Sequence, residues 1–506
     1  MATSNTEHGP GMQDQNPAAA SLQGATADQP IRFRVTTVTP PRFGLPLMRD
    51  FVTDTLGAFD RLSRAGDVVQ LKVGWQRIHF LFHPELLRTA LLEDEGGLVK
   101  EDRQLRVFAL VHGRSVVTTV GDDWKRQRKL LGAAFGPRQV SRYLDLMRSA
   151  AMEANGTFFS SSPPSGMTFD PSVYASQITM DVMLRVLFSE TADLQESAAV
   201  TRSVSHLASA AQEMFGWPWV PAGWMPFPGR GALMHHRALL RERIRRHIEH
   251  RRAATPPEAS VPADLIDAML LAEDTEAVAG QPTSDRRLSA GEVEDNCVTL
   301  FLGGIDTSAS ALTWWMAYMA AHPEHAQRAR EEVAQVMGTD WVSGELDPGR
   351  FASLTVVEAT LKEAMRLRPP IVGPFNRRAR RDISLHGLQI RRGDLVSGSI
   401  WTLHHDERWF PEPATFNPDR FMPGAPSIPR GAFMPFGAGP HVCLGQHFAM
   451  LEMKLVAALL LSQVAWSFPP GETMPAPRVD VTIKPARPIQ LVARSLVRPQ
   501  EAHQSS

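Results

Sequence analysis

The residue best suited to chemistry in this 506-residue chain is Cys443, near the end of a glycine-rich loop. The loop is FGAGPHVCLG, residues 436–445, and the apolar residues after it predict a helix over 444–464. Glycines let a backbone come close to a flat cofactor, and a helix N-terminus stabilises a thiolate. A thiolate ligand to haem iron requires both features. The alternative is a buried, inert cysteine in a glycine turn.

An acid and an alcohol stand side by side in a second segment, GGIDT, residues 303–307. Asp306 and Thr307 lie within the apolar stretch 297–321, which predicts a fully buried helix. A carboxylate there costs free energy unless it has a partner or a task, so the two residues are candidates for proton transfer. The alternative is a salt-bridged Asp306 and a Thr307 hydroxyl bonded to the carbonyl one turn earlier.

A third candidate is the pair Glu363 and Arg366, which lie one turn apart on one face of a predicted helix. Two pairs within residues 242–252 have the same spacing and look like ordinary solvated pairs. The spacing alone is therefore a weak signal.

These motifs together resemble the cytochrome P450 family from about residue 40 onward, with its loop F-x-x-G-x-[RH]-x-C-x-G and its E-x-x-R pair. The resemblance implies that Cys443 is the proximal ligand of haem b and that Phe436 packs against the thiolate. It also implies that Gly437 and Gly445 belong to the haem-binding loop. Asp306 and Thr307 would deliver protons during the activation of dioxygen, as the resemblance implies.

The resemblance also implies which residues bind the haem propionates. They are His441, Trp124 and Arg128 in WKRQR (residues 124–128), and Arg377 in NRRA (residues 376–379). Guanidinium groups suit carboxylates; the alternative for both arginines is a solvated surface charge.

By the same resemblance, Arg420 in FNPDRF (residues 416–421) joins Glu363 and Arg366 in a buried structural network.

The resemblance places a set of mainly apolar side chains over the distal haem face: Phe108, Val111, Val116, Phe215, Phe301, Ile305, Ile371, Val372 and Ile483. Such a lining predicts a medium-to-large lipophile such as a terpenoid, polyketide or fatty-acid derivative. Arg103 or Arg114 could anchor a carboxylate at the mouth, and the alternative is a solvated loop arginine. The aromatic and proline-rich segment 217–229 is either a lid over this site or packing between two helices.

The elements that position these residues are mostly helical. The patterns predict a helix over 47–64, a strand pair within 67–82 around Gly74, a helix opening at Pro84, mainly helices over 124–370 and short strands after residue 376. We expect a mainly α protein with small β-sheets, a cytochrome P450 fold in one large domain over residues 39–497. Disordered tails are expected over 1–38 and 498–506.

Composition limits the partners. With 53 Lys and Arg against 54 Asp and Glu, the chain has no basic footprint for nucleic acid. Only two cysteines occur, and no signal or anchor segment is evident, so we expect a cytoplasmic monomer without a membrane anchor. No flavin or iron–sulfur domain is evident either, so a separate ferredoxin or flavodoxin would supply electrons. That partner would dock on a basic face formed by Lys125, Arg126, Lys129 and Arg138. The alternative is that these residues form an ordinary solvated helix face.

The expected function is that of a haem-thiolate monooxygenase that inserts one atom of O2 into a lipophilic substrate, by hydroxylation or epoxidation. A peroxide-driven member, a member that catalyses oxidative coupling and a non-catalytic haem-binding sensor are the alternatives. Asp306 and Thr307 argue against the peroxide-driven enzyme and the sensor, because neither needs a relay acid.

Overall fold

The computed structural model describes residues 32–39, 45–93, 97–159, 166–189, 194–215, 217, 219–222, 224–254, 262, 264–273, 286–338, 341–342, 344 and 346–496. Statements about the structure concern these residues.

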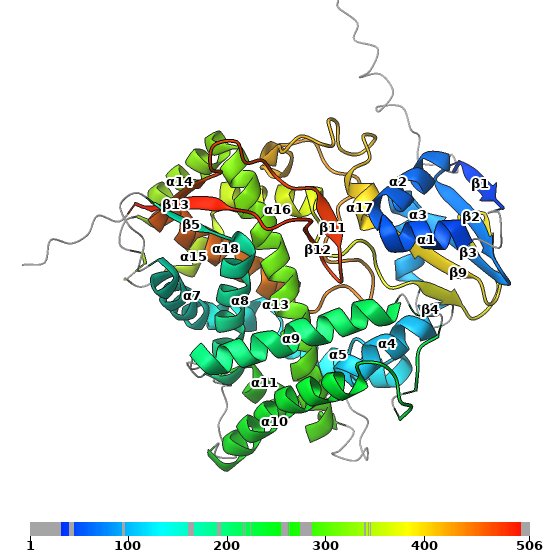
Figure 1. Ribbon diagram of the computed structural model, residues 1–506, viewed down its shortest axis with the longest axis horizontal. Coiled ribbons are helices and arrows are strands. Elements are labelled where there is room, and N and C mark those ends of the chain that lie inside the picture. Colours follow the sequence, from blue (N-terminus) through cyan, green and yellow to red (C-terminus); the bar gives the residue numbers. More distant parts are fainter. Residues whose placement is uncertain are drawn as a thin grey trace, which may run out of the picture.

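A six-stranded sheet lies at one end of the molecule (Figure 1). Its order is β1 (Val35–Val38), β2 (Val68–Val73), β3 (Gln76–Leu81), β9 (Leu395–Gly398), β6 (Arg377–Ala379) and β4 (Leu98–Lys100). The turn between β2 and β3 contains Gly74 at φ +59°, a conformation that favours glycine. The strand pair predicted around this glycine is confirmed.

The first strand corrects one expectation. Residues 35–38 were expected within a disordered tail, but β1 pairs with β2 in parallel from Val35 opposite Val68. Two valines and two threonines form it, and β-branched residues fit a pleated edge. Residues 1–31 and 498–506 lie outside the described residues.

The predicted helix over 47–64 is two helices, α1 (Leu45–Thr53) and α2 (Thr55–Ala65). Asp54 separates them, because its side chain accepts a hydrogen bond from the Gly57 N–H and caps α2. The helix predicted to open at Pro84 is confirmed as α3 (Pro84–Leu92).

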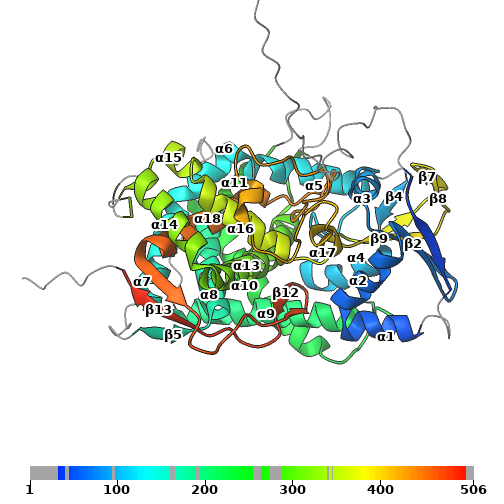
Figure 2. The same cartoon turned by 90° about the horizontal axis from the view of Figure 1, so that it is seen from above.

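Helices form the rest of the body (Figures 1 and 2). They are α4 (Asp102–His112), α5 (Gly121–Ala134), α6 (Pro137–Val140), the 3-10 helix η2 (Ser141–Tyr143), α7 (Leu144–Phe159), α8 (Pro171–Phe188), α9 (Leu194–Phe215), α10 (Arg230–Ala254), α11 (Leu265–Leu271), α13 (Ala290–Ala321), α14 (Pro323–Met337), α15 (Pro348–Ala352), α16 (Thr355–Leu367), α17 (Ile400–His404), the 3-10 helix η3 (Pro418–Phe421) and α18 (Gln446–Gln463). None of the described helices is long and apolar enough to cross a membrane.

Helix α13 runs through the centre of this body and packs against α8, α16, α10 and α18. It begins with a capping box in which Ser289 and Glu292 satisfy each other's backbone N–H groups. Its core-facing tryptophans, Trp314 and Trp315, are fully buried. The central helix thus gives Asp306 and Thr307 a rigid support.

Three small sheets complete the fold. β10 (Val464–Ser467), β13 (Leu491–Ser495) and β5 (Met167–Phe169) form one, β7 (Ile383–Leu385) and β8 (Leu388–Ile390) the second, and β11 (Pro477–Val479) and β12 (Ile483–Pro485) the third. The expected class, mainly α with small β-sheets, is confirmed.

Candidate active site

Cys443 lies in a closed loop directly before α18. Its N–H donates to the Phe436 carbonyl at 2.9 Å. Gly439, at φ +75°, passes so close to the Leu91 carbonyl that a Cβ would meet its oxygen at 2.2 Å. The loop is therefore pinned against α3, and only glycine fits at position 439.

The Cys443 side chain is accessible, but it lies deep within the protein and not on the outer surface. This enclosure raises the pKa of the thiol, while the Gly445 N–H and the Arg128 charge oppose the rise. Such a cysteine becomes a thiolate when a bound metal ion displaces its proton.

Open space borders both of the elements that carry candidate residues. A Cβ added at Gly437 or Gly445 in the cysteine loop, or at Gly303 on α13, would meet no atom within 4 Å. Gly303 is exposed, so the expectation that residues 297–321 are fully buried is wrong at this position. A flat group has room beside these glycines.

Cationic groups gather around His441. Its ring lies 3.9 Å from that of Trp124, centroid to centroid. Burial, aided by the charges of Lys100, Arg377 and Arg128, lowers the pKa of His441 to about 3. Burying several cations together costs free energy unless an anion compensates them.

Lys100 was missed by the sequence reasoning. It stands opposite Arg377 in the pairing of β4 with β6, and the two residues are 5% and 4% exposed. Its Nζ donates to the Val117 carbonyl at 2.8 Å. A lysine in the apolar strand LVK was the available signal, but only the strand pairing places it beside Arg377.

Asp306 and Thr307 make the contacts that the structural alternative predicts. Lys484 Nζ lies 2.8 Å from Asp306 Oδ1, and Thr482 Oγ1 donates to Asp306 Oδ2 at 2.8 Å. Thr307 Oγ1 donates to the Gly303 carbonyl one turn earlier. The proton-transfer role of the pair stays a prediction.

A second acid lies near this part of α13. Glu452 on α18 is fully buried, and burial raises its pKa to about 8. The Ser308 hydroxyl on α13 acts in the opposite direction and lowers this pKa. The carboxyl group is therefore mainly protonated at neutral pH. Sequence reasoning missed it because a lone Glu in an apolar helix resembles a helix-end or surface residue.

The structure brings Glu363, Arg366 and Arg420 together. Arg366 donates from Nε and Nη2 to both carboxylate oxygens of Glu363 at 2.8 Å, and both side chains are fully buried. Arg420 Nε lies 3.4 Å from Glu363 Oε1. The network connects α16 to η3.

Three of the expected pocket residues are almost fully buried. Phe301 and Ile483 are 0% exposed and Val111 is 1% exposed. Phe301 packs against the Phe188 ring, and Ile483 packs in a cluster that includes Trp314. Phe301 and Val111 belong to the large buried cluster of the helical body, and Ile483 of β12 belongs to a smaller one, so their place in the pocket stays a prediction.

An aromatic group lies where the pocket is expected. The Phe108 ring lies 5.4 Å from that of Phe215 and 4.9 Å from that of Phe375, and all three residues are half-buried. Ile371 and Val372 are half-buried too, whereas Val116 and Ile305 are 9% and 3% exposed. These residues keep the expected lining apolar.

The two arginines at the expected mouth bind the protein itself. The Arg103 guanidinium donates to the carbonyls of Phe215 and Trp217, joining α4 to the end of α9. Arg114 pairs with Asp123. Arg103 is therefore not a solvated loop arginine, and the expectation that Arg103 or Arg114 anchors a carboxylate stays a prediction.

Part of the segment between α9 and α10 packs between helices, as one of the two alternatives expected, and its role as a lid stays a prediction. The Trp217 ring packs edge-on against Phe227 at 5.7 Å, and both residues pack against the core. Trp219 and Trp224 are 55% and 80% exposed.

The basic face expected on α5 is partly engaged. Arg126 pairs with Glu292 and donates to the Arg287 carbonyl at 3.1 Å. Lys125 is exposed, 3.8 Å from Asp122. Arg126 therefore supports the start of α13 and is only 23% exposed in its side chain.

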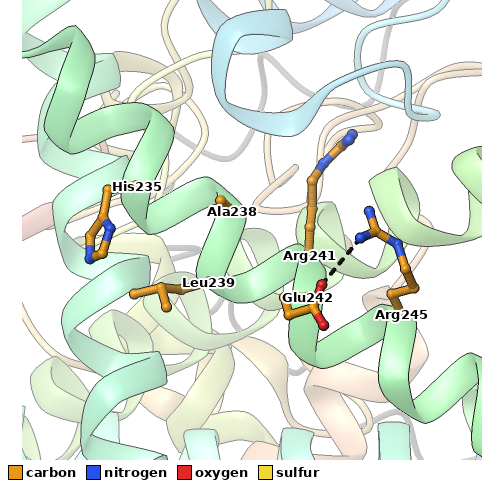
Figure 3. A pocket seen from close by; sticks show the side chains of 6 residues that line it. All are labelled: His235, Ala238, Leu239, Arg241, Glu242 and Arg245. Carbon is orange, nitrogen blue, oxygen red and sulfur yellow. Dashed lines mark hydrogen bonds and ion pairs between the residues drawn. The ribbon is translucent and has the colours of Figure 1, made fainter.

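A depression on the α10 surface lies apart from these residues (Figure 3). Arg245 pairs there with Glu242 and with Glu294 of α13, and Arg241 pairs with Asp295. The two arginines of this depression thus connect α10 to α13.

Comparison with known proteins agrees with this arrangement. The family model described as Cytochrome P450 matches residues 41–492, so the chain belongs to the cytochrome P450 family. Cyclooctat-9-en-7-ol 5-monooxygenase of Streptomyces melanosporofaciens is 28% identical over 92% of this chain and 96% of the relative. Cyclooctatin synthase of the same organism is 29% identical over 92% and 97%. The chain is a cytochrome P450 monooxygenase, an oxidoreductase.

Solved structures share the fold. Retinoic acid bound cyanobacterial CYP120A1 superposes with a TM-score of 0.73 at 24% identity, covering 89% of this chain and 96% of that one. The cytochrome P450DA heme domain gives a TM-score of 0.76 at 21% identity, covering 92% and 99%.

The family implies a haem cofactor, and the residues present fit it. Cys443 faces open space, glycines on both elements leave room for a flat group, and the cations around His441 suit two carboxylates.

Proposed function

We propose that this monooxygenase inserts one oxygen atom from O2 into an uncharged lipophile, by hydroxylation or epoxidation. The observation that carries the proposal is that polar side chains around the apolar lining are hydrogen-bonded to the protein's own backbone or are uncharged. Arg103 donates to backbone carbonyls, and Arg237 donates to the Leu110 carbonyl at 3.1 Å. Burial lowers the pKa of His112 to about 4, so this side chain is neutral. Because these three groups are neutral or bonded to the protein's own carbonyls, binding would come from buried apolar area.

The names of the relatives support a terpenoid-like substrate. One Streptomyces relative is named for oxidation of cyclooctat-9-en-7-ol, and a Glycyrrhiza uralensis relative, 27% identical, is named 11-oxo-beta-amyrin 30-oxidase. Both names describe oxidation of a compound that already contains oxygen.

The proposed cofactor is haem b, which would supply dioxygen binding and the oxidising equivalent. Cys443 would be its ligand, with Phe436, Gly437 and Gly445 forming the loop beside it. The propionates would be bound by Trp124, Arg128, Arg377 and His441, and by Lys100, whose buried ammonium stands opposite Arg377.

For proton delivery, the proposed groups are Asp306, Thr307 and Glu452. The Thr307 hydroxyl would hold a water on the distal side, and Asp306 would return the proton that this water gives up. Glu452 would hold a proton beside Ser308 at neutral pH, because its pKa is raised to about 8.

Electrons would come from a separate ferredoxin or flavodoxin that docks on α5, and the enzyme would act as a monomer. Lys125 and Lys129 are the better candidates for docking, because Arg126 supports α13. Charge reversal at Lys125 should slow electron transfer most at low salt. An unchanged rate and salt dependence would place docking elsewhere.

The test uses substrate-induced spin-state spectra over a library of neutral terpenoids, fatty acids and small polar compounds, followed by turnover with surrogate redox partners. Neutral lipophiles should shift the spectrum, and their products should gain one oxygen atom. Hits confined to charged or hydrophilic compounds would contradict the proposal. Turnover with peroxide alone would favour the peroxide-driven alternative, dimeric products would favour oxidative coupling, and binding without any turnover would favour a sensor.

A further inference from the structure

The β11–β12 hairpin holds the carboxylate of Asp306 at two points. Lys484 Nζ lies 2.8 Å from Oδ1, and the Thr482 hydroxyl donates to Oδ2 at 2.8 Å. Both oxygens of the acid are thus occupied by residues 176 and 178 positions later in the chain. The Asp306 side chain is 21% exposed and that of Lys484 is 39% exposed, so the ion pair extends from α13 toward solvent.

The residue between these two contacts fixes the hairpin to the same helix. The Ile483 carbonyl accepts a hydrogen bond from Ser310 Oγ at 2.8 Å and another from Trp314 Nε1 at 2.9 Å. Asp306, Ser310 and Trp314 are spaced by four residues, so they occupy one face of α13. The hairpin therefore covers this face, with Asp306 at one end.

The hairpin is also tied to the expected substrate space. The Ile483 N–H donates to the Pro370 carbonyl at 2.9 Å. The side chain of Val372 packs against the buried cluster that contains Ile483 and Trp314. The segment that carries Ile371 and Val372 of the expected lining therefore packs together with the two residues that hold Asp306.

We propose that Thr482 and Lys484 are positioning residues for Asp306, which fix its carboxylate and make its placement depend on the hairpin beside the substrate. This inference rests on the proposed role of Asp306 in proton delivery. Lys484 places a positive charge 2.8 Å from Oδ1, and the Thr482 hydroxyl fixes the orientation of the carboxylate through Oδ2. Both contacts come from one hairpin, so the position of the hairpin sets the position of the carboxylate.

The test compares the haem-loaded wild type with two haem-loaded variants, Lys484→Met and Thr482→Val. Methionine keeps the length of the lysine side chain and removes its charge. Product formed per electron consumed should fall about tenfold in Lys484→Met, and more peroxide should be released. This loss is smaller than the roughly 10²–10⁴-fold typical for removal of an acid–base group, because Asp306 itself remains. The dissociation constant of the substrate should stay within about twofold of wild type. Lys484→Arg should restore most of the coupling.

A matched control lies on the same hairpin. Arg478 stands opposite Lys484 in the strand register but pairs with Asp480 at 2.9 Å. Arg478→Met should leave coupling unchanged. Amide hydrogen exchange gives a readout independent of turnover: residues 482–484 should exchange faster in Asp306→Asn and in Lys484→Met than in wild type or Arg478→Met.

The outcomes separate this inference from the proposed function. If Asp306→Asn itself couples normally, the proton role of Asp306 fails. If Asp306→Asn is impaired while Lys484→Met couples like wild type, only the positioning role fails. The double variant Asp306→Asn with Lys484→Met should be no worse than Asp306→Asn, since Lys484 acts through Asp306; additive losses would overturn the inference.

Discussion

Glu363→Ala should destabilise the fold severely. Arg366 has five N–H donors, of which two bind Glu363 and three bind the carbonyls of His404, Pro413 and Thr415. Removing Glu363 leaves a fully buried guanidinium without its counter-charge and with two unsatisfied N–H groups. The expected cost is about 3–5 kcal/mol, and the three remaining bonds to carbonyls favour the lower end.

Such a loss is a large part of a typical unfolding free energy of about 5–15 kcal/mol, so we expect little haem-loaded protein at physiological temperature. The assay is urea unfolding followed by circular dichroism, with haem content measured from the reduced carbon monoxide complex. Glu363→Gln, which keeps an acceptor, should retain more stability and allows measurement if the alanine variant does not fold.

Lys362→Ala on the same helix provides the control. Lys362 forms a half-exposed ion pair with Glu358 at 2.7 Å, so its loss should cost about 0.5 kcal/mol or less. A Glu363→Ala protein with full haem content and an unfolding free energy within about 1 kcal/mol of wild type would refute the reasoning.

Four further results are expected. Cys443→Ala should lose the thiolate signature in the spectrum of the reduced carbon monoxide complex, and an unchanged spectrum would exclude Cys443 as the ligand. Thr307→Ala should keep substrate binding while diverting electrons to peroxide, since the proposed role of the hydroxyl is proton delivery; unchanged coupling would contradict this role. Lys100→Met should lose haem to apomyoglobin about tenfold faster or more, because it removes a buried cation proposed to bind the propionates; equal loss rates would place Lys100 outside the site. Burial lowers the pKa of His112 from 6.5 to about 4, so between these pH values the unfolded state binds more protons than the folded state. The free energy of unfolding should therefore fall as the pH drops from about 6.5 to 4, and His112→Gln should remove about 3 kcal/mol of this fall. An equal fall in the variant would contradict the assignment.

Local patterns predicted the elements that carry the site. The turn at Gly74, the proline opening α3 and the apolar run forming α18 are set by neighbouring residues, so sequence spacing was enough to find them. The short strand β1 was missed because its four residues gain their partners only from β2, 33 positions away.

Long-range contacts in the site could not be predicted. Lys484 and Thr482 reach Asp306 only because the hairpin packs on α13, and Lys100 joins the cationic cluster only through the register of β4 with β6. Phe301 and Ile483 show the same limit, since an apolar side chain suits a pocket wall and a core equally well.

The covering of α13 by the hairpin has a consequence for biosynthesis. The Ile483 carbonyl meets Ser310 across 173 positions, and β13 supplies the partner of β5 from more than 300 positions away. During synthesis on the ribosome, Trp314 and its neighbours on this face therefore stay exposed to solvent until nearly the whole chain has emerged. Nascent chains should depend on chaperones over this interval, and slower translation at low temperature should raise the yield of folded protein.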